Sequence, residues 1–480
     1  MTRINTNTSA LAAVRNLSRS QRSLQSSLER LSTGLRINRG ADDPAGLIIS
    51  QNLRSEIESV RQAIANSQRA SNVIATTEGA LDEVANLLND IKSLIIEAAN
   101  SGAVSDDEIR ANQLQIDDAI NSITRIANTT TFGGRKLLNG SLSYITSGIV
   151  ATQITDLNIS KAQLGTAPFL PVEINVIQSA QRAQLFFPVD VLSGSVTIEL
   201  AGQNGVDSIA LQSGQTASQI LAAINSKTDA TGVSATFING NAASGIILTS
   251  VGFGSDAFVS VQEIGGNGAI QALFEDETGA QKARDIGRDV SATINGAGII
   301  GKGLNLALNN SALGIELRIQ EAFNTNGSAS SFAIAGGGAI FQLGPGVDTN
   351  QQVNIGVQSV AATRLGNATI GYLQEITDAG KFSLTKGEAS QAAMIIEEAI
   401  KQVSVLRGRL GAFEKNTLDT NVNQLSITME NLTAAESSIR DLDFAMETAQ
   451  LTRNQILVSA GTSILAVANQ TPQSVLSLLR

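Results

Sequence analysis

Both ends of the chain carry apolar residues at steps of three and four, the spacing that predicts amphipathic helices. Near the start these positions form a heptad seam, the pattern of a coiled coil, with Gln21 as the single polar intrusion. After Pro44 the helical spacing continues without another proline to about residue 101, and a shorter helix is predicted over about 105–128. The predicted seam of the first segment consists of Val14, Leu17, Leu24, Leu28, Leu31 and Leu35.

The other end of the chain mirrors this pattern. Residues 386–440 keep helical spacing without a proline and predict a second long rod. A last segment is expected to break at Pro472, because proline cannot donate a backbone hydrogen bond. Its predicted seam consists of Leu457, Ala460, Ile464 and Val467, followed by an apolar tail with Leu476 and Leu479. Each rod is expected to cover the apolar stripe of the other.

Between the rods, residues 141–345 change to alternating apolar and polar runs such as "SVTIEL" and "GIILTS", which predict strands. The expected fold class is therefore α+β, with long antiparallel helical rods formed by both termini and a β-rich central insertion that forms outer domains. We expect an inner coiled-coil domain of 1–43 with 441–480, a rod domain of 44–179 with 346–440, and an outer insertion of 180–345.

The stretch "LSTGLRINRGADDPAGLIIS", residues 31–50, joins the first helix to the long rod. Gly34, Gly40 and Gly46 permit turns that other residues resist, and Asp43 followed by Pro44 is a strong helix start. A phosphate-binding loop is disfavoured, because no Gly-Lys-Ser/Thr ending and no preceding strand are present. The stretch is interpreted as a joint.

Composition removes most enzymatic functions. The chain has no cysteine, histidine or tryptophan, which excludes disulfides, zinc sites built on Cys or His, and bases that use imidazole. We expect no catalytic residues, cofactor or metal. The net charge of −10 gives a nucleic-acid partner no support, and no apolar run is long enough to span a membrane, so neither partner is expected.

The first 28 residues contain arginines but no acid, a composition typical of a mitochondrial transit peptide. The alternative is the solvated basic face of an amphipathic helix. The regular seam favours the second interpretation.

Three long stretches resemble bacterial flagellin, the subunit of the flagellar filament. They are "INTNTSALAAVRNLSRSQRSLQSSLERLSTGLRINRGADDPAGLIIS", "NVNQLSITMENLTAAESSIRDLDFAMETAQLTRNQIL" and "ANQTPQSVLSLLR". Residues 194–239 are similar to that family's hook IN motif. The resemblance implies a structural protein that polymerises into a helical homopolymer for swimming motility, with residues 31–50 as a spoke between its inner and rod domains.

The same resemblance implies export of the unfolded chain by the type III route into an extracellular flagellum. It also implies an export chaperone on the C-terminal helical segment, a filament cap and a hook–filament junction protein as partners. In flagellins that a Toll-like receptor recognises, the rod offers a basic residue at the position of Asp90. Here Leu94 keeps the family residue, but Asp90 and Glu97 are acidic, so weakened receptor binding is expected.

Two alternatives stay open beside the flagellin interpretation. A metallopeptidase inside the insertion needs the histidines of H-E-x-x-H, which this chain lacks. A related secreted axial protein, such as the hook–filament junction protein or a flagellin-like adhesin, would use the same rods.

Overall fold

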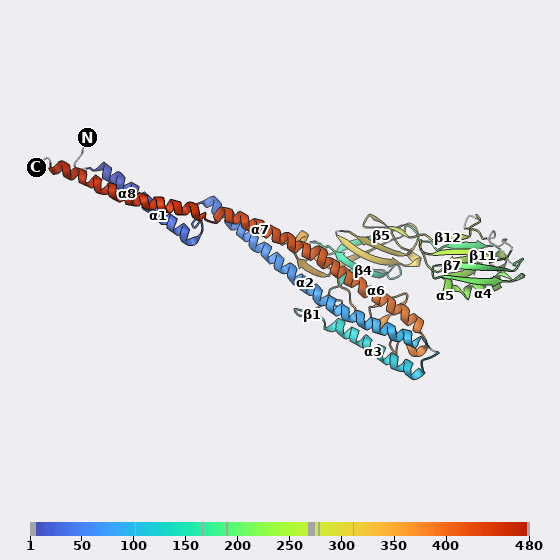
Figure 1. Cartoon of the computed structure of the whole chain (residues 1–480). Coiled ribbons are helices and arrows are strands. Elements are labelled where there is room, and N and C mark those ends of the chain that lie inside the picture. Colours follow the sequence, from blue (N-terminus) through green and yellow to red (C-terminus); the bar gives the residue numbers. More distant parts are fainter. Residues whose placement is uncertain are drawn as a thin grey trace. The chain divides into compact units, whose positions relative to one another are not determined.

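The computed structural model describes residues 6–477 except 101, 166, 189–190, 267–273, 277–278 and 311, and it describes side chains as far as residue 470. These residues form two compact units. The terminal unit contains the described residues up to 71, 342–351 and those from 413 on, and the central unit contains 72–341 and 352–412. Helices come from the two ends of the chain and strands from its middle, which confirms the α+β class (Figure 1).

Four helices build the terminal unit. α1 (Thr8–Thr33) lies antiparallel to α8 (Phe444–Ser477), and the blue and red ribbons run side by side in Figure 1. The first part of α2 (Pro44–Ala98) packs on α7 (Thr420–Arg440). This contact buries Val60, Ala63 and Leu425, with Ile64, Met429 and Leu432 against them.

α8 does not end at Pro472, as the sequence predicted, but continues to Ser477. A proline inside a helix leaves the carbonyl four residues earlier without its usual amide partner. That carbonyl belongs to Ala468, and it accepts a hydrogen bond of 2.8 Å from the Asn7 side chain. The lost helix hydrogen bond is therefore replaced from the other end of the chain.

The rod of the central unit consists of the rest of α2, α3 (Asp106–Thr129) and α6 (Ala389–Phe413). Ser105 and Glu108 form a capping box at the start of α3, which satisfies two otherwise unpaired amides. Ion pairs join α2 to α6 at Lys92–Glu397 and Asp82–Arg407, both 2.9 Å long. Beyond α6 the helix passes through a π-helical turn, Glu414–Asp419, before α7 begins. The apolar core of the rod contains Leu81, Val84, Leu88, Ile91, Ile95, Ile116, Ile123, Ile395, Ile396, Ala399 and Val403.

Two antiparallel sheets share one core beside the rod. The five-stranded sheet has the order β14-β13-β5-β17-β3, and the three-stranded sheet has the order β15-β16-β4. Their bounds are β3 (Tyr144–Ser147), β4 (Ile154–Ala162), β5 (Leu170–Gln178), β13 (Ser291–Ile294), β14 (Ala297–Ile300), β15 (Asn305–Asn309), β16 (Leu313–Ile319) and β17 (Ala329–Gly337).

The predicted boundary between residues 179 and 180 is wrong, because it separates hydrogen-bonded neighbours. β5 lies before that boundary, and it pairs with β13 and β17, which lie after it. The β-rich part therefore begins with β3. The change of sequence pattern at residue 141 agrees with this start, but the boundary of the insertion was drawn about forty residues too late.

A second β module follows β5 and has its own core, in which Phe187 stacks on Phe274 with ring centres 4.8 Å apart. Its sheets have the orders β6-β10-β9 and β12-β11-β7-β8. The strands and helices are β6 (Gln184–Phe187), β7 (Val196–Gly202), β8 (Val206–Leu211), α4 (Ala217–Asn225), α5 (Thr228–Thr231), β9 (Val233–Phe237), β10 (Ile246–Ser250), β11 (Phe258–Gly265) and β12 (Arg284–Ile286).

Three further pairs of short strands occur among the described residues. They are β1 (Thr131–Phe132) with β2 (Arg135–Lys136), β18 (Ala339–Gln342) with β19 (Gln352–Ile355), and β20 (Gly366–Asn367) with β21 (Gly371–Tyr372).

The chain enters and leaves the second module at one place, since Gln181 and Arg288 exchange backbone hydrogen bonds of 2.8 and 3.0 Å. We predict that replacing 184–286 by a short Gly-Ser linker leaves the rest of the central unit folded, because the cut ends already lie together. Removing 180–345 should instead give insoluble protein, because β5 then loses both neighbours and exposes its buried residues. Expression in the soluble fraction and thermal melting followed by circular dichroism measure both outcomes. Equal solubility of the two deletions would contradict this division.

Candidate functional site on the terminal helices

The contact between α1 and α8 combines small or polar residues with leucine and valine side chains. Ser27 and Asn454 are 3% and 4% exposed, and the Asn454 amide donates to the Ser27 hydroxyl at 3.2 Å. Leu17 packs so closely on Gly461 that a Cβ at that glycine would lie 3.2 Å from the leucine Cδ1. The seam consists of Ala10, Ala13, Leu17, Ser20, Leu24, Ser27 and Leu31 on α1, and of Glu447, Leu451, Asn454, Val458, Gly461, Leu465 and Ala468 on α8.

Both lists follow steps of three and four, so the contact is a heptad seam, but its register differs from the predicted one. Only Leu17, Leu24 and Leu31 of the predicted set lie on it, and these three are half-buried. On α8 the real seam is displaced by one residue from the predicted one. In the single chain the structure does not bring Val14, Leu28, Leu457, Ala460, Ile464 and Val467 into this contact.

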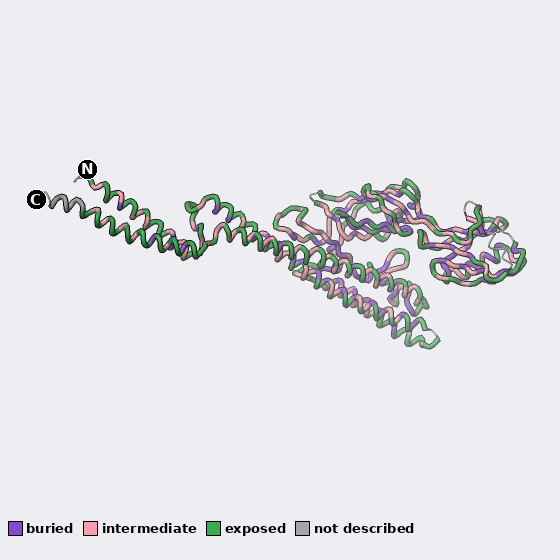
Figure 2. Tube along the Cα trace, turned by 45° about the horizontal axis from the view of Figure 1, so that its top comes forward, coloured by how far each residue is buried: buried purple, intermediate pink, exposed green. Residues whose placement is uncertain are grey.

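The displaced residues form apolar stripes on the outside of the pair. Leu28 is 51% exposed, Ile464 is 60% exposed and Val467 is 65% exposed. Figure 2 shows the same result, because most of both helices is drawn as exposed and only a few positions as buried. The prediction counted only apolar side chains, whereas this contact also uses small and polar residues such as Ser27, Asn454 and Gly461, which carry no apolar signal. Leu476 lies in α8 with its side chain outside the described residues, as does the whole of Leu479.

The joint after α1 is held by the segment between α7 and α8. Leu442 N–H donates to Gly34 O at 3.0 Å, and Arg36 N–H donates to Arg440 O at 2.8 Å. Leu35 is half-buried there and forms a β-bridge with Asp441. Residues 34–36 and 440–442 thus form a short antiparallel ladder within the terminal unit.

Acidic side chains order the rest of this joint. The Asp42 carboxylate accepts from the amides of Arg39 and Asn38, and these bonds, with the Arg39 amide first, hold the pKa of Asp42 below its usual value. Asp43 Oδ1 accepts from Gly46 N–H at 2.9 Å and so caps α2, with Pro44 as its first residue.

The three glycines of the joint have different roles. Gly34 ends α1 at φ 72°, a left-handed conformation that favours glycine. Gly40 and Gly46 do not have positive φ. Gly40 lies in a turn that is closed by a hydrogen bond of 3.0 Å from Asp42 N–H to Arg39 O, as expected, whereas Gly46 lies inside α2, so the expectation of a turn was wrong for Gly46. Gly46 is needed for space, because a Cβ there would lie 2.8 Å from Ile37 Cδ1 and would clash with the Asp43 carboxylate.

The predicted receptor patch lies on α2 in the central unit. Asp90 and Glu97 are exposed, and Leu94 between them is half-buried. The charged pair is therefore available at the surface, while the leucine also packs in the rod.

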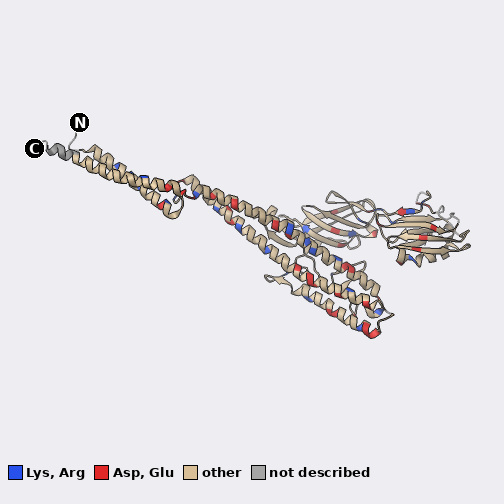
Figure 3. Cartoon of the chain, in the orientation of Figure 1, with Lys and Arg blue, Asp and Glu red and all other residues tan. Residues whose placement is uncertain are grey.

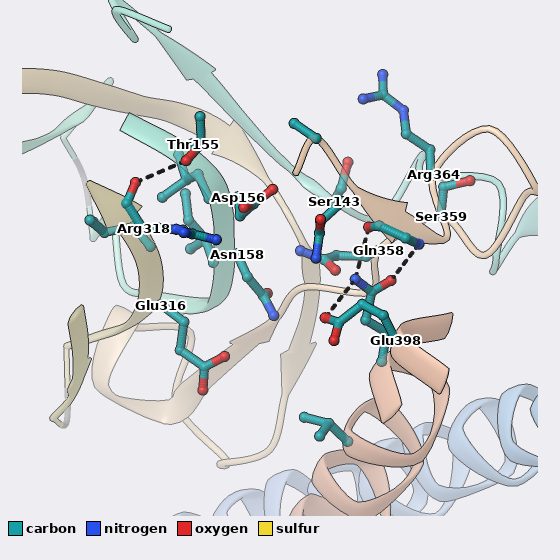
Figure 4. Close-up of a pocket in the computed structure, with 18 of the residues that line it drawn as sticks. Ser143, Thr155, Asp156, Asn158, Glu316, Arg318, Gln358, Ser359, Arg364 and Glu398 are labelled. Carbon is teal, nitrogen blue, oxygen red and sulfur yellow. Dashed lines mark hydrogen bonds between the residues drawn. The ribbon is translucent and has the colours of Figure 1, made fainter. Parts of the chain in front are cut away.

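A polar cavity of about 1510 Å³ opens in the central unit between α6 and strands β4 and β16 (Figure 4). Asp156 enters it from a bulge in β4, where its φ is 50°. At its floor Arg409 Nη2 donates to Gly356 O at 2.9 Å, and Tyr144 accepts from Ala162 N–H. Burial raises the pKa of Tyr144 to about 12, so this hydroxyl stays neutral at physiological pH. Within the described residues, no group of three or more metal-ligating side chains occurs.

Charge is distributed unevenly along the chain. Figure 3 shows basic residues without acidic ones on the part of the α1–α8 pair that is farther from the joint. Arg15, Arg19, Arg22 and Arg453 are exposed there, and no ion pair is found for them among the described residues.

Comparison with known proteins assigns the chain that carries this helix pair to a family. Family models for the bacterial flagellin N-terminal helical region, the C-terminal helical region and the flagellin hook IN motif match residues 4–143, 393–479 and 197–252. B-type flagellin of Pseudomonas aeruginosa is 32% identical over 497 residues, which cover 99% of each chain. The chain belongs to the flagellin family. Flagellin of Salmonella typhimurium is 29% identical, again over 99% of each chain.

Among solved structures, the flagellar junction protein FlgL of Legionella pneumophila matches 82% of this flagellin and 99% of its own chain, at 12% identity and a TM-score of 0.30. The flagellar cap protein FliD of Escherichia coli matches 45% of this chain and 64% of its own, at 19% identity and a TM-score of 0.28. Scores this low carry no argument about either protein. The relatives found by sequence carry the assignment. A flagellin is a structural subunit of the extracellular flagellar filament, not an enzyme.

The sequence analysis missed the small and polar residues of this flagellin's seam. Ser27, Asn454 and Gly461 carry no apolar signal, yet they fall on a strict heptad with Glu447 and Leu451. The proline in α8 was a second signal, because an unpaired carbonyl requires a donor from elsewhere.

We predict that Asn7→Ala weakens the terminal pair by about 1–2 kcal/mol, since Asn7 both caps α1 and donates to Ala468 O. Asn7→Asp should lose only the second contact, because aspartate still caps. Adding Pro472→Ala gives the Ala468 carbonyl a backbone donor, so Asn7→Asp should then have a smaller effect. Hydrogen-exchange protection of the first turns of α1 measures each change. If Asn7→Asp reduces the protection equally with and without Pro472→Ala, Asn7 does not compensate for the hydrogen bond that Pro472 cannot form.

Proposed function

We propose that the apolar residues left outside the α1–α8 pair are the surface through which copies of this flagellin contact one another in the filament. The observation that supports this is that the seam of the pair does not cover all of its large apolar residues: Leu28, Ile464 and others stay exposed on the outside. Full burial of one such side chain contributes about 1.5–3 kcal/mol. In a single chain about half or more of these side chains stays exposed, and a neighbouring copy can cover the rest.

A repeating contact between different patches builds an open helix of subunits rather than a closed ring. In this proposal α1 and α8 form the innermost layer, the helices α2, α3, α6 and α7 supply the rod, and the β-rich insertion lies outside. The joint at 31–50 is the spoke. Its ladder to Arg440 and Leu442 supports this role, because it holds the beginning of α8 beside the end of α1.

The same surface fits the other partners that the family resemblance implies. An export chaperone would cover the apolar stripe of α8 before assembly, because exposed stripes of this kind otherwise promote aggregation. A filament cap and a hook–filament junction protein would meet the same helices at the two ends of the polymer.

The substitution Leu28→Asp tests the assembly surface, because it puts a charge where a neighbour should pack. We predict that the variant is secreted as soluble subunit but does not polymerise, and that Val467→Asp behaves in the same way. The stability of the isolated subunit should change by less than about 1 kcal/mol, since Leu28 is half exposed there. Electron microscopy of filaments and thermal melting of the subunit measure the two effects.

Ser23→Asp is the matched control, because Ser23 is an exposed polar residue on the same helix. It should polymerise normally. Filaments formed by Leu28→Asp would place this leucine outside the contact, whereas loss of secretion would indicate that it serves export.

We also propose that Toll-like receptor recognition is weakened by the exposed carboxylates of Asp90 and Glu97. Like charges repel across an interface. Flagellins that the receptor recognises carry a basic residue where this chain has Asp90, so the charge at this position has the opposite sign. We predict that Asp90→Arg raises potency in a receptor-reporter assay by about tenfold or more. Asp118→Arg on α3 is the control with the same charge change at an exposed site. Full potency of the unchanged protein would refute the proposal.

A further inference from the structure

The part of the terminal pair beyond the joint is a purely cationic region of an acidic protein. Residues 1–28 and 448–480 contain six arginines and neither an acid nor a lysine, although the whole chain has a net charge of −10. In the described part, Arg15, Arg19, Arg22 and Arg453 are exposed. Their charges therefore face solvent without compensation from this region.

The arginines lie next to exposed apolar residues. On α1, exposed Val14 and Leu28 lie on one side of the helix, about four turns apart, and Arg15, Arg19 and Arg22 lie about 100° further round the helix. On α8, Arg453 lies within the stripe that contains Ile464, Leu457 and Met446, all of which are exposed. Each helix therefore presents cations and large apolar side chains on neighbouring parts of its free surface.

This combination fits the boundary of an anionic lipid bilayer. An interfacial helix places its apolar side chains between the acyl chains and its arginines at the headgroups, and it needs low overall hydrophobicity. No helix among the described residues has the length and apolar character of a membrane span. The expectation of no membrane partner rested on the absence of a span, and that absence does not exclude binding along the surface.

A nucleic acid fits the same region less well. Polyanion binding uses the arginines but gives no use for exposed Val14, Leu28 and Ile464, and single-stranded binding depends on aromatic stacking. In the described part of the pair, Phe444 is the only aromatic residue, and it lies beside the joint.

We propose that the free subunit of this flagellin binds anionic lipid bilayers through the outer parts of α1 and α8, lying on the membrane surface. The binding uses the surface that assembly would cover, so polymerised protein does not bind. It needs only the surface of the single chain and does not depend on how neighbouring copies pack.

Flotation with lipid vesicles tests the proposal on the full-length subunit. One vesicle preparation is pure phosphatidylcholine, and the other contains about a third phosphatidylglycerol, whose charge gives the surface a negative potential. Binding to the anionic vesicles should be at least about tenfold tighter and should weaken as salt is added. Equal binding to both preparations, or to neither, would overturn the proposal.

Matched triple variants locate the surface. Arg15, Arg19 and Arg22 changed together to Gln should abolish binding to the anionic vesicles. The control changes Arg54, Arg125 and Arg135 to Gln, which removes the same charge from exposed sites elsewhere and should leave binding unchanged. Circular dichroism verifies that both proteins keep their helix content. Equal losses in the two variants would show a general charge effect and refute the assignment.

Val14→Ser with Leu28→Ser separates a membrane from any other polyanion. The pair should weaken vesicle binding several-fold, because it removes apolar contact but no charge. Double-stranded DNA is the comparison probe. Binding to DNA as tight as to vesicles, with no effect of the serine variants on either, would mean a general polyanion surface and would overturn the membrane proposal.

Filaments in the same flotation assay separate this proposal from the assembly surface. Binding by subunits but not by filaments agrees with both. If filaments bind vesicles as tightly as subunits do, the proposed assembly surface and the loss of vesicle binding on polymerisation are both contradicted. The triple variants still decide in that case whether the arginines bind lipid.

Discussion

The contact between Ser27 and Asn454 is the constraint on which the terminal unit depends. Two helices whose facing residues are small can approach closely, and a buried amide–hydroxyl bond fixes their register, because a shift would leave both groups unpaired. This seam leaves other large apolar side chains, such as Leu28 and Ile464, exposed on both helices. These exposed side chains are the ones that the proposed assembly surface uses.

The sequence allowed the helices to be predicted well, because their apolar spacing is long and regular. It gave α2 a start at Pro44, as observed, with the Asp43 side chain as its cap. It failed at the register of the inner seam, since counting large apolar residues finds the stripe that is richest in them. In this pair that stripe is the exposed one, and only packing distances such as that of Leu17 to Gly461 reveal which stripe faces the partner helix.

The β-rich part shows a different limit. Alternation along a strand predicts that the strand exists but contains no information about its partners, which are fixed by contacts far away in sequence. β5 and β17 are separated by more than a hundred residues, and a complete second module lies between β5 and β13. The boundary predicted at residue 180 therefore divided one sheet. The glycines of the joint illustrate the same limit, because a sequence cannot distinguish a glycine needed for its φ, such as Gly34, from one needed for space, such as Gly46.

The hydrogen bond from Asn7 to Ala468 joins positions 461 residues apart. Closing a loop costs more conformational entropy as the loop becomes longer, so such a contact forms late, after nearer segments have folded. A chain still being synthesised cannot form it, because residue 468 does not yet exist when the first helix is complete. The pairing of α1 with α8 therefore requires both segments in one molecule, and a chain in which either segment is missing leaves the other without its partner helix.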